Sequence, residues 1–364
     1  MSLLFSRLKR AAGAVAIAAI GLGATAASAQ DVTTLRLSTH HPSNSPEIEK
    51  IINPMKEFIE TKSGGKLKVE VYPNAMLNSP KDAFKALSTD IADIAPTYPV
   101  YQARSFSLNH VSSLPQAFPN TYVGFRVNEE LYADFYKPEW DKIGVYPLFY
   151  AVTDTYDLIT TKPIKSIDDL KGMKIRSAGG IMDEVVKALG ASAVSIPISE
   201  AYTAFQQGVV DGIFQGASNM ITFRLNEVGK YYVPLAITRT AIPWSVNPET
   251  FKKLSPDMQQ VVFDAAREAT INYADRYTNA VEQAQKELKE SGVQTIELSK
   301  EDHDKIQAAI NPLWDKFIEE NGDQGKALVE ALRSKVAAYG DMDRDTFVRL
   351  QREEPVKGMM PPQK

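Results

Sequence analysis

The residue in this sequence whose placement could do chemistry is an arginine at the end of a predicted strand. Arg176 closes the stretch MKIR, and the turn Ser177–Gly180 leads into a predicted helix from Ile181 to Leu189. A guanidinium at the carboxyl end of a parallel strand, beside a helix N-terminus, offers a carboxylate two fixed N–H donors and a favourable dipole. The pattern predicts organic-acid binding at Arg176. The same sequence is also compatible with an arginine that pairs with an internal Asp or Glu.

Residues suited to covalent or metal chemistry are scarce. The chain of 364 residues has no cysteine and four histidines, at positions 40, 41, 110 and 303. Without cysteine there are no disulfides, thiol nucleophiles or Cys-based zinc sites. Dinucleotide, phosphate-loop and zinc-protease motifs are also absent from the sequence. We therefore expect a binding protein rather than an enzyme, with no cofactor and no metal site.

Two weak metal patterns do not change this expectation. The segment 341–345 resembles the start of a calcium loop, but Thr346 stands where that loop requires glycine. It is expected to be an acidic helix start instead. The pair His40–His41 has no third ligand nearby in the sequence, so we expect it to be loop surface.

The composition is that of a folded protein without a nucleic-acid surface. Hydrophobic residues make up 44% of the chain, and 45 acidic side chains against 41 basic ones give a net charge of −4. Nucleic-acid binding needs clustered Lys and Arg to neutralise phosphates, and the sequence has no polybasic run. We therefore expect no nucleic-acid partner. The length predicts two domains, at about 150 residues each.

The N-terminus has the layout of a cleavable signal peptide. Basic residues within 7–10 precede an apolar run at 11–24, and small residues at 27–29 match what a signal peptidase reads. A membrane anchor is the alternative, but the apolar run is shorter than the roughly 20 residues that span a bilayer. We predict cleavage after Ala29. Because no cysteine follows that could carry a lipid, the expected location is the periplasm of a two-membrane bacterium.

Predicted strands and helices alternate along the chain. Near the start, Leu35–Ser38 and Lys66–Tyr72 alternate as strands do, on either side of a helix with one apolar face, Pro46–Ser63. A similar alternation recurs between Ser166 and Phe214, where Gly and Pro separate short strands from short helices. This order predicts an α/β fold with mainly parallel sheets and right-handed crossovers.

Capping residues mark where the helices should begin. Ser166 with Asp169 forms a predicted capping box, and Ser199 is predicted to cap a later helix. Ser255 begins a helix that no glycine or further proline interrupts through residue 291. At about 1.5 Å per residue such a helix exceeds roughly 50 Å, which is longer than a small domain. We therefore expect the helix at about 256–291 to lie across two domains.

Several longer stretches carry a resemblance to a known family. They are PIKSIDDLKGMKIRSAGG and ALGASAVSIPISEAYTAFQQGVVDGIFQG within 163–216, GGKLKVEVYPNAML at 64–77, and LSPDMQQVVFDAAREA at 254–269. In this order, after an export signal, they resemble the solute receptors of tripartite ATP-independent periplasmic (TRAP) transporters, the dicarboxylate type. The resemblance extends over essentially the whole mature chain.

The resemblance implies the two-lobed clamshell of periplasmic binding proteins. Each lobe is then a mixed, mainly parallel sheet flanked by helices, and a long helix spans both lobes. The boundaries expected after the signal peptide at 1–29 are residues 30–153 plus 241–275 for lobe I and residues 154–240 plus 276–364 for lobe II.

The resemblance also assigns site residues one by one. The arginine of the family's KIR motif, which holds the ligand carboxylate, falls on Arg176. The asparagine that many members place after the VDG motif falls on Gln215, which is still an amide. An arginine that sialic-acid-type members use falls on Tyr156, so this departure argues against a sialic-acid ligand.

Aromatic residues are common near these positions. They are Tyr98, Phe149, Tyr150, Tyr156, Phe214 and Trp244. Such rings could line an apolar or aromatic pocket, and the alternative is that many of them are ordinary lobe core. The predicted ligand is a monocarboxylate with an apolar or aromatic body, and the ligand-binding residues expected besides Arg176 and Gln215 are Tyr156, Phe214, Tyr98, Phe149 and Trp244.

The function implied by the resemblance is capture without bond breaking. The receptor closes on a small organic acid, and membrane subunits of TRAP type recognise the closed form and import the acid with an ion gradient. The chain is expected to act as a monomer. A sensor that presents the acid to a membrane kinase is the alternative. A periplasmic enzyme is disfavoured because no nucleophile, base and orienting residue can be assembled.

Overall fold

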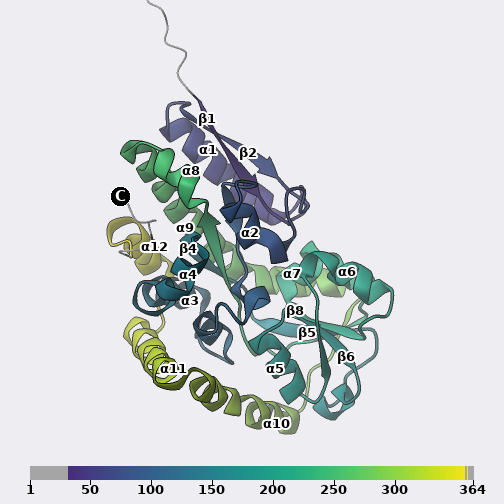
Figure 1. Ribbon diagram of the computed structural model, residues 1–364. Coiled ribbons are helices and arrows are strands. Elements are labelled where there is room, and N and C mark those ends of the chain that lie inside the picture. Colours follow the sequence, from purple (N-terminus) through teal and green to yellow (C-terminus); the bar gives the residue numbers. More distant parts are fainter. Residues whose placement is uncertain (1–31, 357–358, 360–364) are drawn as a thin grey trace, which may run out of the picture. The chain divides into compact units, whose positions relative to one another are not determined.

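The computed structural model describes residues 32–356 and 359 (Figure 1). The predicted signal peptide, residues 1–29, lies outside these described residues. The described strands form two sheets, and the helices flank them.

The first sheet combines strands from the start of the chain with one strand from much later. Its order is β2-β1-β3-β10-β4. The strands are β1 (Thr33–Ser38), β2 (Leu67–Tyr72), β3 (Ile94–Pro96), β4 (Tyr146–Val152) and β10 (Ala241–Val246). β1 pairs in parallel with β2 and β3, whereas β10 is antiparallel to both of its neighbours, β3 and β4. The late strand β10 therefore returns the chain to the sheet where it began.

The second sheet has the order β11-β9-β5-β8-β6-β7. Its strands are β5 (Tyr156–Thr160), β6 (Lys174–Ser177), β7 (Ser192–Ser195), β8 (Gly212–Gly216), β9 (Tyr231–Val233) and β11 (Gln294–Thr295). β6 is parallel to β7 and β8, and β5 is antiparallel to β8 and β9. Two mixed sheets flanked by helices confirm the predicted fold class.

Short helices connect the strands. Between β1 and β4 these are η1 (Ile48–Ile52), α1 (Asn53–Lys62), η2 (Pro80–Asp82), α2 (Ala83–Ser88), η3 (Pro99–Gln102), η4 (Leu108–Ser113), α3 (Thr121–Leu131), η5 (Tyr132–Tyr136) and α4 (Lys137–Ile143). Between β5 and α9 they are η6 (Ile167–Leu170), α5 (Ile181–Ala188), α6 (Ile198–Gln206), α7 (Ala217–Thr222), η7 (Leu225–Glu227) and α8 (Pro248–Lys253). The predicted strand and helix order of the first and middle thirds is thus present.

The long helix predicted at 256–291 is α9 (Pro256–Glu290). Its N-cap is Ser255, whose side chain accepts a hydrogen bond from the Met258 N–H. α9 contacts α1 and β4 of the first sheet's side, and also α7 and β11 of the second (Figure 1). A single helix therefore connects the surroundings of both sheets, as its length predicts.

Among the described residues, three helices follow α9. They are α10 (Lys300–Ile310), α11 (Pro312–Tyr339) and α12 (Arg344–Glu353). α10 contacts α5, whereas α11 and α12 contact α3 (Figure 1). Asp343 caps α12 and accepts a hydrogen bond from the Thr346 N–H. The acidic segment is therefore a helix start, as expected.

The capping predictions have mixed outcomes. Ser166 and Asp169 form the predicted capping box at the start of η6. The prediction that Ser199 caps α6 was wrong, because the helix begins at Ile198 with Pro197 in the N-cap position. Pro197 fixes its own backbone angle at the boundary, so the helix begins one residue before Ser199, which lies in its first turn and does not cap it.

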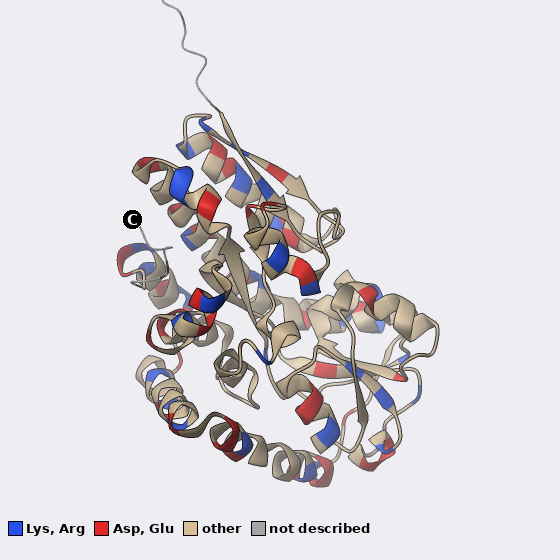
Figure 2. Ribbon diagram, viewed as in Figure 1, with Lys and Arg blue, Asp and Glu red and all other residues tan. Residues whose placement is uncertain are grey.

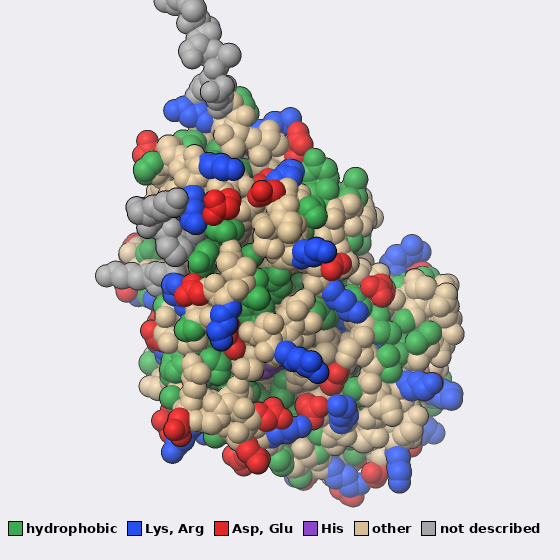
Figure 3. All heavy atoms as spheres, in the orientation of Figure 1, with side chains coloured by type: hydrophobic (Ala, Val, Ile, Leu, Met, Phe, Trp, Pro, Cys, Tyr) green, Lys and Arg blue, Asp and Glu red, His purple; other side chains and the backbone are tan. Residues whose placement is uncertain are grey.

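Buried hydrophobic residues form one large core and one smaller one. The smaller core lies where β5, β8 and β9 meet α6, α7 and the end of α9. Acidic and basic residues are interspersed along the outer helices (Figure 2), and the face shown in Figure 3 has no extended patch of one sign. Within residues 32–356, no helix combines the length and hydropathy needed to cross a membrane.

Candidate functional site

A small cavity lies where strand ends of the two sheets face each other. From the first sheet's side it is lined by residues that follow β1 and β3, and from the second by residues of β5, β6 and β8. They include His40, His41, Tyr98, Tyr156, Arg176 and Gln215. The cavity has a volume of about 30 Å³, close to the share of one water molecule in the liquid. The side chains that line the cavity must therefore move outward to enclose an organic acid.

Arg176 lies on β6 and brings a positive charge to this cavity. The strand lies between β7 and β8, and Arg176 is opposite Val194 and Ile213 in the parallel ladders. Its side chain is buried, with 0% of the residue exposed. Nε donates to the Ile196 carbonyl at 2.7 Å, and Nη1 donates to Gln215 Oε1 at 2.9 Å.

Arg176 has no carboxylate partner. No Asp or Glu among the described residues forms a salt bridge with its guanidinium. The alternative of an internal ion pair, left open by the sequence, is therefore absent from this part of the chain. Neutral carbonyl and amide oxygens hold the guanidinium in place and leave its positive charge without a counterion.

The turn after Arg176 needs its glycines. Gly179 and Gly180 have φ values of +96° and +54°, which L side chains rarely adopt. A Cβ on Gly180 would lie 2.2 Å from Cε1 of His110. His110 belongs to η4, so the turn packs directly against the part of the chain that precedes β4. The two sides therefore touch at this turn.

Tyr156 and Tyr98 add hydroxyls and ring surface to the cavity. Tyr156 begins β5 and is opposite Gly216 in the antiparallel pairing with β8. Burial raises the pKa of Tyr156 to about 12, so its hydroxyl stays protonated. The Tyr98 hydroxyl lies 3.1 Å from Nδ1 of His40. Both tyrosines can therefore take part in hydrogen bonding to a polar ligand.

The structure does not bring the other three predicted aromatic residues to the cavity. The rings of Phe149 and Trp244 stack on each other with centroids 5.9 Å apart, and both contact Tyr273 within the core of the first sheet's side. Phe214 precedes Gln215 on β8, and neighbouring residues of a strand point to opposite faces. Its ring meets Tyr156 edge to face at 5.4 Å. Of the predicted set, the cavity gathers Arg176, Gln215, Tyr156 and Tyr98.

Sequence reasoning missed the histidine pair. His40 and His41 are 7% and 5% exposed, so the expectation of loop surface was wrong. The reason is a contact with a distant part of the chain, since the ring of Phe223 at the end of α7 stacks on His40 with centroids 5.7 Å apart. Burial lowers the pKa of His40 well below its ordinary value, and burial together with Arg276 lowers that of His41 to about 3. Both rings are therefore neutral at physiological pH.

Asn219 and Tyr277 are further lining residues without a sequence prediction. Asn219 lies in the first half of α7, and Tyr277 lies in the middle of α9. The sequence did contain one signal that His40 lines the site, because this residue stands two positions after β1. Residues that follow parallel strands gather at one sheet edge, which is the edge where Arg176 was expected.

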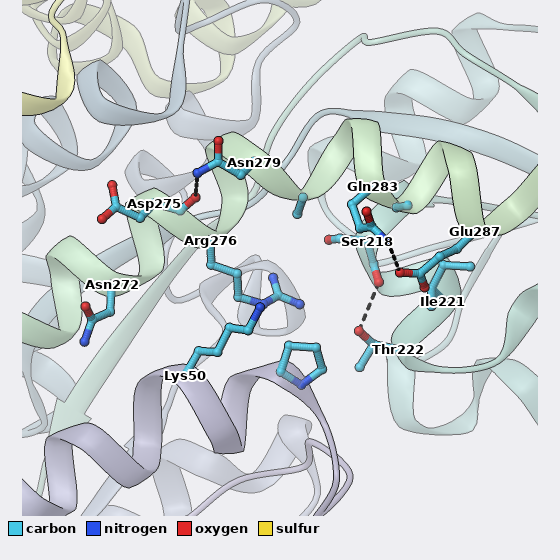
Figure 4. Close-up of a pocket in the computed structure, with 13 residues that line it drawn as sticks. Lys50, Ser218, Ile221, Thr222, Asn272, Asp275, Arg276, Asn279, Gln283 and Glu287 are labelled. Atoms are coloured by element: carbon cyan, nitrogen blue, oxygen red, sulfur yellow. Dashed lines mark hydrogen bonds between the residues drawn. The ribbon is translucent and has the colours of Figure 1, made fainter.

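A larger cavity lies beneath the middle of α9, with a volume of about 470 Å³ (Figure 4). Arg276 extends from α9 toward Lys50 in this view. Its guanidinium already pairs with Glu47 at 2.8 Å, and Asp275 pairs with Arg344 at 2.7 Å. The buried charge there is compensated, whereas that of Arg176 is not, so the smaller cavity is the better candidate for an acid.

The described residues offer no obvious place for a metal ion. Within residues 32–356 and 359, no group of three or more His, Cys, Asp or Glu residues converges closely enough to bind one. The chemistry available at the cavity is that of a buried cation, amides, hydroxyls and neutral imidazoles. This combination suits reversible binding of an anion.

This chain is similar in sequence and fold to several known proteins. The C4-dicarboxylate-binding periplasmic protein DctP of Rhodobacter capsulatus is 26% identical over 280 residues, which are 76% of this chain and 84% of that protein. A marine metagenome TRAP solute-binding protein specific for aromatic acids, solved with metahydroxyphenylacetate, matches with a TM-score of 0.78 and 21% identity, over 85% of this chain and 99% of that one. The sugar-acid-binding protein DctPAm of Advenella mimigardefordensis, solved with galactonate, matches with a TM-score of 0.77 and 23% identity, over 84% of this chain and 100% of that one.

The family assignment rests on a match of most of the chain. The model of the DctP family, described as bacterial extracellular solute-binding protein, family 7, matches residues 37–321. This range includes the whole second sheet, the first sheet except the start of β1, and the whole of α9. The chain therefore belongs to family 7 of the bacterial extracellular solute-binding proteins.

Proposed function

We propose that this protein captures a small organic acid in the periplasm and delivers it unchanged to a TRAP-type membrane transporter. Membership of an extracellular solute-binding family supports the capture step. Export through the predicted signal peptide, with cleavage after Ala29, would place the protein in the periplasm. In this proposal the receptor acts as a monomer and has no catalytic role.

The observation that carries the proposal is the uncompensated charge of Arg176. Burying an ion without a partner costs several kcal/mol, yet the described chain supplies only the Ile196 carbonyl and the Gln215 amide oxygen. A ligand carboxylate would offset that cost with a two-pronged, charge-assisted hydrogen bond. Ligand capture and burial of Arg176 would then be one event.

The same observation explains why the two sides should close around the ligand. We assign residues 30–153 plus 241–275 to lobe I and residues 154–240 plus 276–364 to lobe II, as the family resemblance implies. Two of the three connections between these lobes run side by side, because Thr153 N–H donates to the Thr240 carbonyl at 3.0 Å; the third is α9, which crosses at residues 275 and 276. Bending at this pair would open the cavity, and a ligand would favour closure through contacts made only in the closed form.

The ligand we propose has one carboxylate and an apolar or aromatic body. Tyr98, Tyr101, Tyr156 and Tyr277 line the cavity beside Arg176 and supply ring surface for such a body. The related receptor that binds aromatic acids supports this choice. Because another related receptor binds galactonate, the sugar acids are the class to test against.

A thermal-shift screen tests the proposal. The protein would be screened with benzoate-like, aliphatic and sugar acids, and the proposal expects a rise in melting temperature with benzoate-like or aliphatic monocarboxylates. A response to sugar acids alone would overturn the proposed ligand class. A turnover assay on each acid that binds checks the capture mechanism, because the recovered ligand should be chemically unchanged.

A further inference from the structure

The larger cavity, beneath the middle of α9, has the features of a second binding site. It has a volume of about 470 Å³ and is lined from three elements (Figure 4). Arg276 lies on α9, Lys50 on η1 and Ser218 on α7. We call it the α9 cavity. We propose that the α9 cavity binds a phosphate group at Arg276 and Lys50, and that this binding favours the closed arrangement of the two lobes.

The first support is hydrogen-bonding capacity that Arg276 has left over. Its side chain is 6% exposed, and Nη2 lies 2.8 Å from Glu47 Oε1. The other two nitrogens, Nε and Nη1, are buried and have no hydrogen-bond partner among the described residues. Arg276 lines the α9 cavity, whereas Glu47 does not. Buried donors in folded proteins are almost always paired, so these two nitrogens indicate an acceptor that comes from outside the chain.

The second support is a pair of cationic side chains that extend toward each other. Lys50 approaches from η1 and Arg276 from α9 (Figure 4). Glu47 balances the charge of Arg276, but no carboxylate among the described residues forms a salt bridge with Lys50. Like charges that converge repel each other unless an anion lies between them. The excess positive charge of Lys50 therefore favours an anion at this end of the cavity.

The acidic residues that line the α9 cavity do not supply that anion. Asp275 accepts two hydrogen bonds from Arg344, at 2.8 and 2.7 Å. Glu287 accepts one from Gln283 at 2.7 Å. Along α9, Glu287 also lies roughly 16 Å beyond Arg276, at 1.5 Å per residue. A charge at that distance is largely screened at physiological salt, so the Arg276 end of the cavity stays cationic.

The directions of the donors favour a phosphate group over a carboxylate. Arg276 and Lys50 approach from different elements, so their N–H groups converge from two sides. A phosphate has oxygens pointing in several directions and can accept from both, whereas the two oxygens of a carboxylate suit a single fork. Ile221 and Ala284 line another part of the cavity and leave room for the organic part of a phosphate ester. Free phosphate and a phosphate ester share this chemistry, and the test below separates them.

The α9 cavity is linked to the acid site through the two lobes. Lys50 belongs to lobe I and Ser218 to lobe II in the assignment given above. The residues next to Ser218 and Arg276 in the chain, Asn219 and Tyr277, line the smaller cavity. A ligand that contacts both lobes favours the arrangement in which both contacts exist. Acid capture is proposed to favour closure too, so each ligand should tighten the binding of the other by the same factor.

The test is calorimetric titration of the full mature protein with inorganic phosphate, phenyl phosphate and glycerol phosphate. We expect saturable binding of at least one of them. In Arg176→Gln, which removes the charge of the acid site, that binding should be unchanged. Tightest binding of inorganic phosphate would identify the free ion as the ligand, and tightest binding of an ester would identify phosphate esters.

Two variants assign the binding to the α9 cavity. Arg276→Lys keeps a charge beside Glu47 but removes the guanidinium fork, and Lys50→Gln removes a charge at an exposed position. We expect the Kd of the best phosphate compound to rise about ten-fold in Arg276→Lys and about three-fold or more in Lys50→Gln. Lys66→Gln, at an exposed lysine outside the cavity, is the control and should keep the affinity.

Acid titration in the presence of a saturating phosphate compound measures the link between the two cavities. We expect the Kd of the tightest-binding acid to fall about five-fold or more. The Kd of the phosphate compound should fall by the same factor when the acid is saturating. In Arg276→Lys both factors should approach one.

The outcomes separate this inference from acid capture. No saturable binding of any phosphate compound, with acids still bound, would overturn the phosphate site and leave acid capture intact. Phosphate binding that is lost in Arg176→Gln but kept in Arg276→Lys and Lys50→Gln, all with unchanged circular dichroism, would also overturn it. Equal acid affinity with and without the phosphate compound would overturn the link. Failure of every acid to bind would overturn acid capture and the link, which rests on it, but not the phosphate site.

Discussion

Arg176 Nη1 donates to Gln215 Oε1 at 2.9 Å, and this amide is the only side-chain partner that the described residues give to the buried guanidinium. The two residues lie on adjacent parallel strands, β6 and β8. An amide fixes the orientation of the guanidinium without neutralising it. The charge is therefore held ready for an anion from outside the chain.

Replacing Arg176 with lysine should weaken acid binding by about 1.5 to 3 kcal/mol, which is roughly a 10- to 150-fold rise in Kd. Lysine keeps the charge but replaces a planar fork with a point charge, so one of the two hydrogen bonds to the carboxylate is lost. Calorimetry with the best acid from the screen measures the change. Arg224→Lys, at an arginine with a 73% exposed side chain, is the matched control. Unchanged affinity in Arg176→Lys would remove Arg176 from the site.

Replacing Gln215 with glutamate should abolish acid binding while keeping the fold. The new carboxylate would lie within hydrogen-bond distance of Arg176 and would occupy the guanidinium from inside the chain. We expect Kd to rise by roughly 100-fold or more and the melting temperature of the free protein to stay level or rise. Gln207→Glu adds the same charge at an exposed position of the same lobe and is the control. Retained affinity in Gln215→Glu would mean that the ligand does not use the Arg176 charge.

Replacing Gly180 with alanine should impair closure. A Cβ there would lie 2.2 Å from His110 Cε1, across the contact between the turn after β6 and η4. We expect faster ligand release and a larger radius of gyration with ligand present. Gly190→Ala is the matched control, because Gly190 also has a positive φ, +91°, but no atom within 4 Å of the added Cβ. Both variants should lose stability, about 1 kcal/mol from backbone strain, but equal ligand affinities in the two would contradict a closing role for this contact.

The stability of the protein should fall as the medium becomes acidic, with a contribution from His110. Burial lowers the pKa of His110 from 6.5 to about 4. Between these values the unfolded chain binds the proton and the folded chain does not, so the unfolding free energy decreases as pH falls from 6.5 toward 4. The contribution of this one group is on the order of 3 kcal/mol. Denaturant unfolding measures the unfolding free energy of His110→Leu at each pH in this range. That free energy should depend less steeply on pH than in the unchanged protein, and an equal dependence would contradict the contribution of His110.

Much of the scaffold could be predicted, because residues close together in the sequence determine where its helices begin and end. The long helix α9 follows from Ser255 and the uninterrupted stretch after it, and η6 follows from the Ser166–Asp169 capping box. In contrast, β10 could not be assigned, because its membership of the first sheet depends on pairing with β3 and β4 from far earlier in the chain. Pairing over such distances leaves little local pattern.

The site was predictable where its geometry follows from strand order. Arg176 lies near the end of β6 and Gln215 near the end of β8, and these two strands are parallel neighbours. Their side chains therefore meet at one sheet edge. The aromatic residues could not be sorted in the same way. Phe149 and Trp244 face the core beside Tyr273, whereas Tyr98 and Tyr156 face the cavity, and only the packing of the two sides separates these cases. The burial of His40 likewise depends on Phe223, which is distant in the chain.

The most direct test is a crystal structure of the protein grown with the tightest-binding acid. We expect one carboxylate within hydrogen-bond distance of both terminal nitrogens of Arg176, in a cavity enclosed by the two lobes. An acid bound elsewhere, with Arg176 paired only to Ile196 and Gln215 as it is here, would contradict acid capture by Arg176.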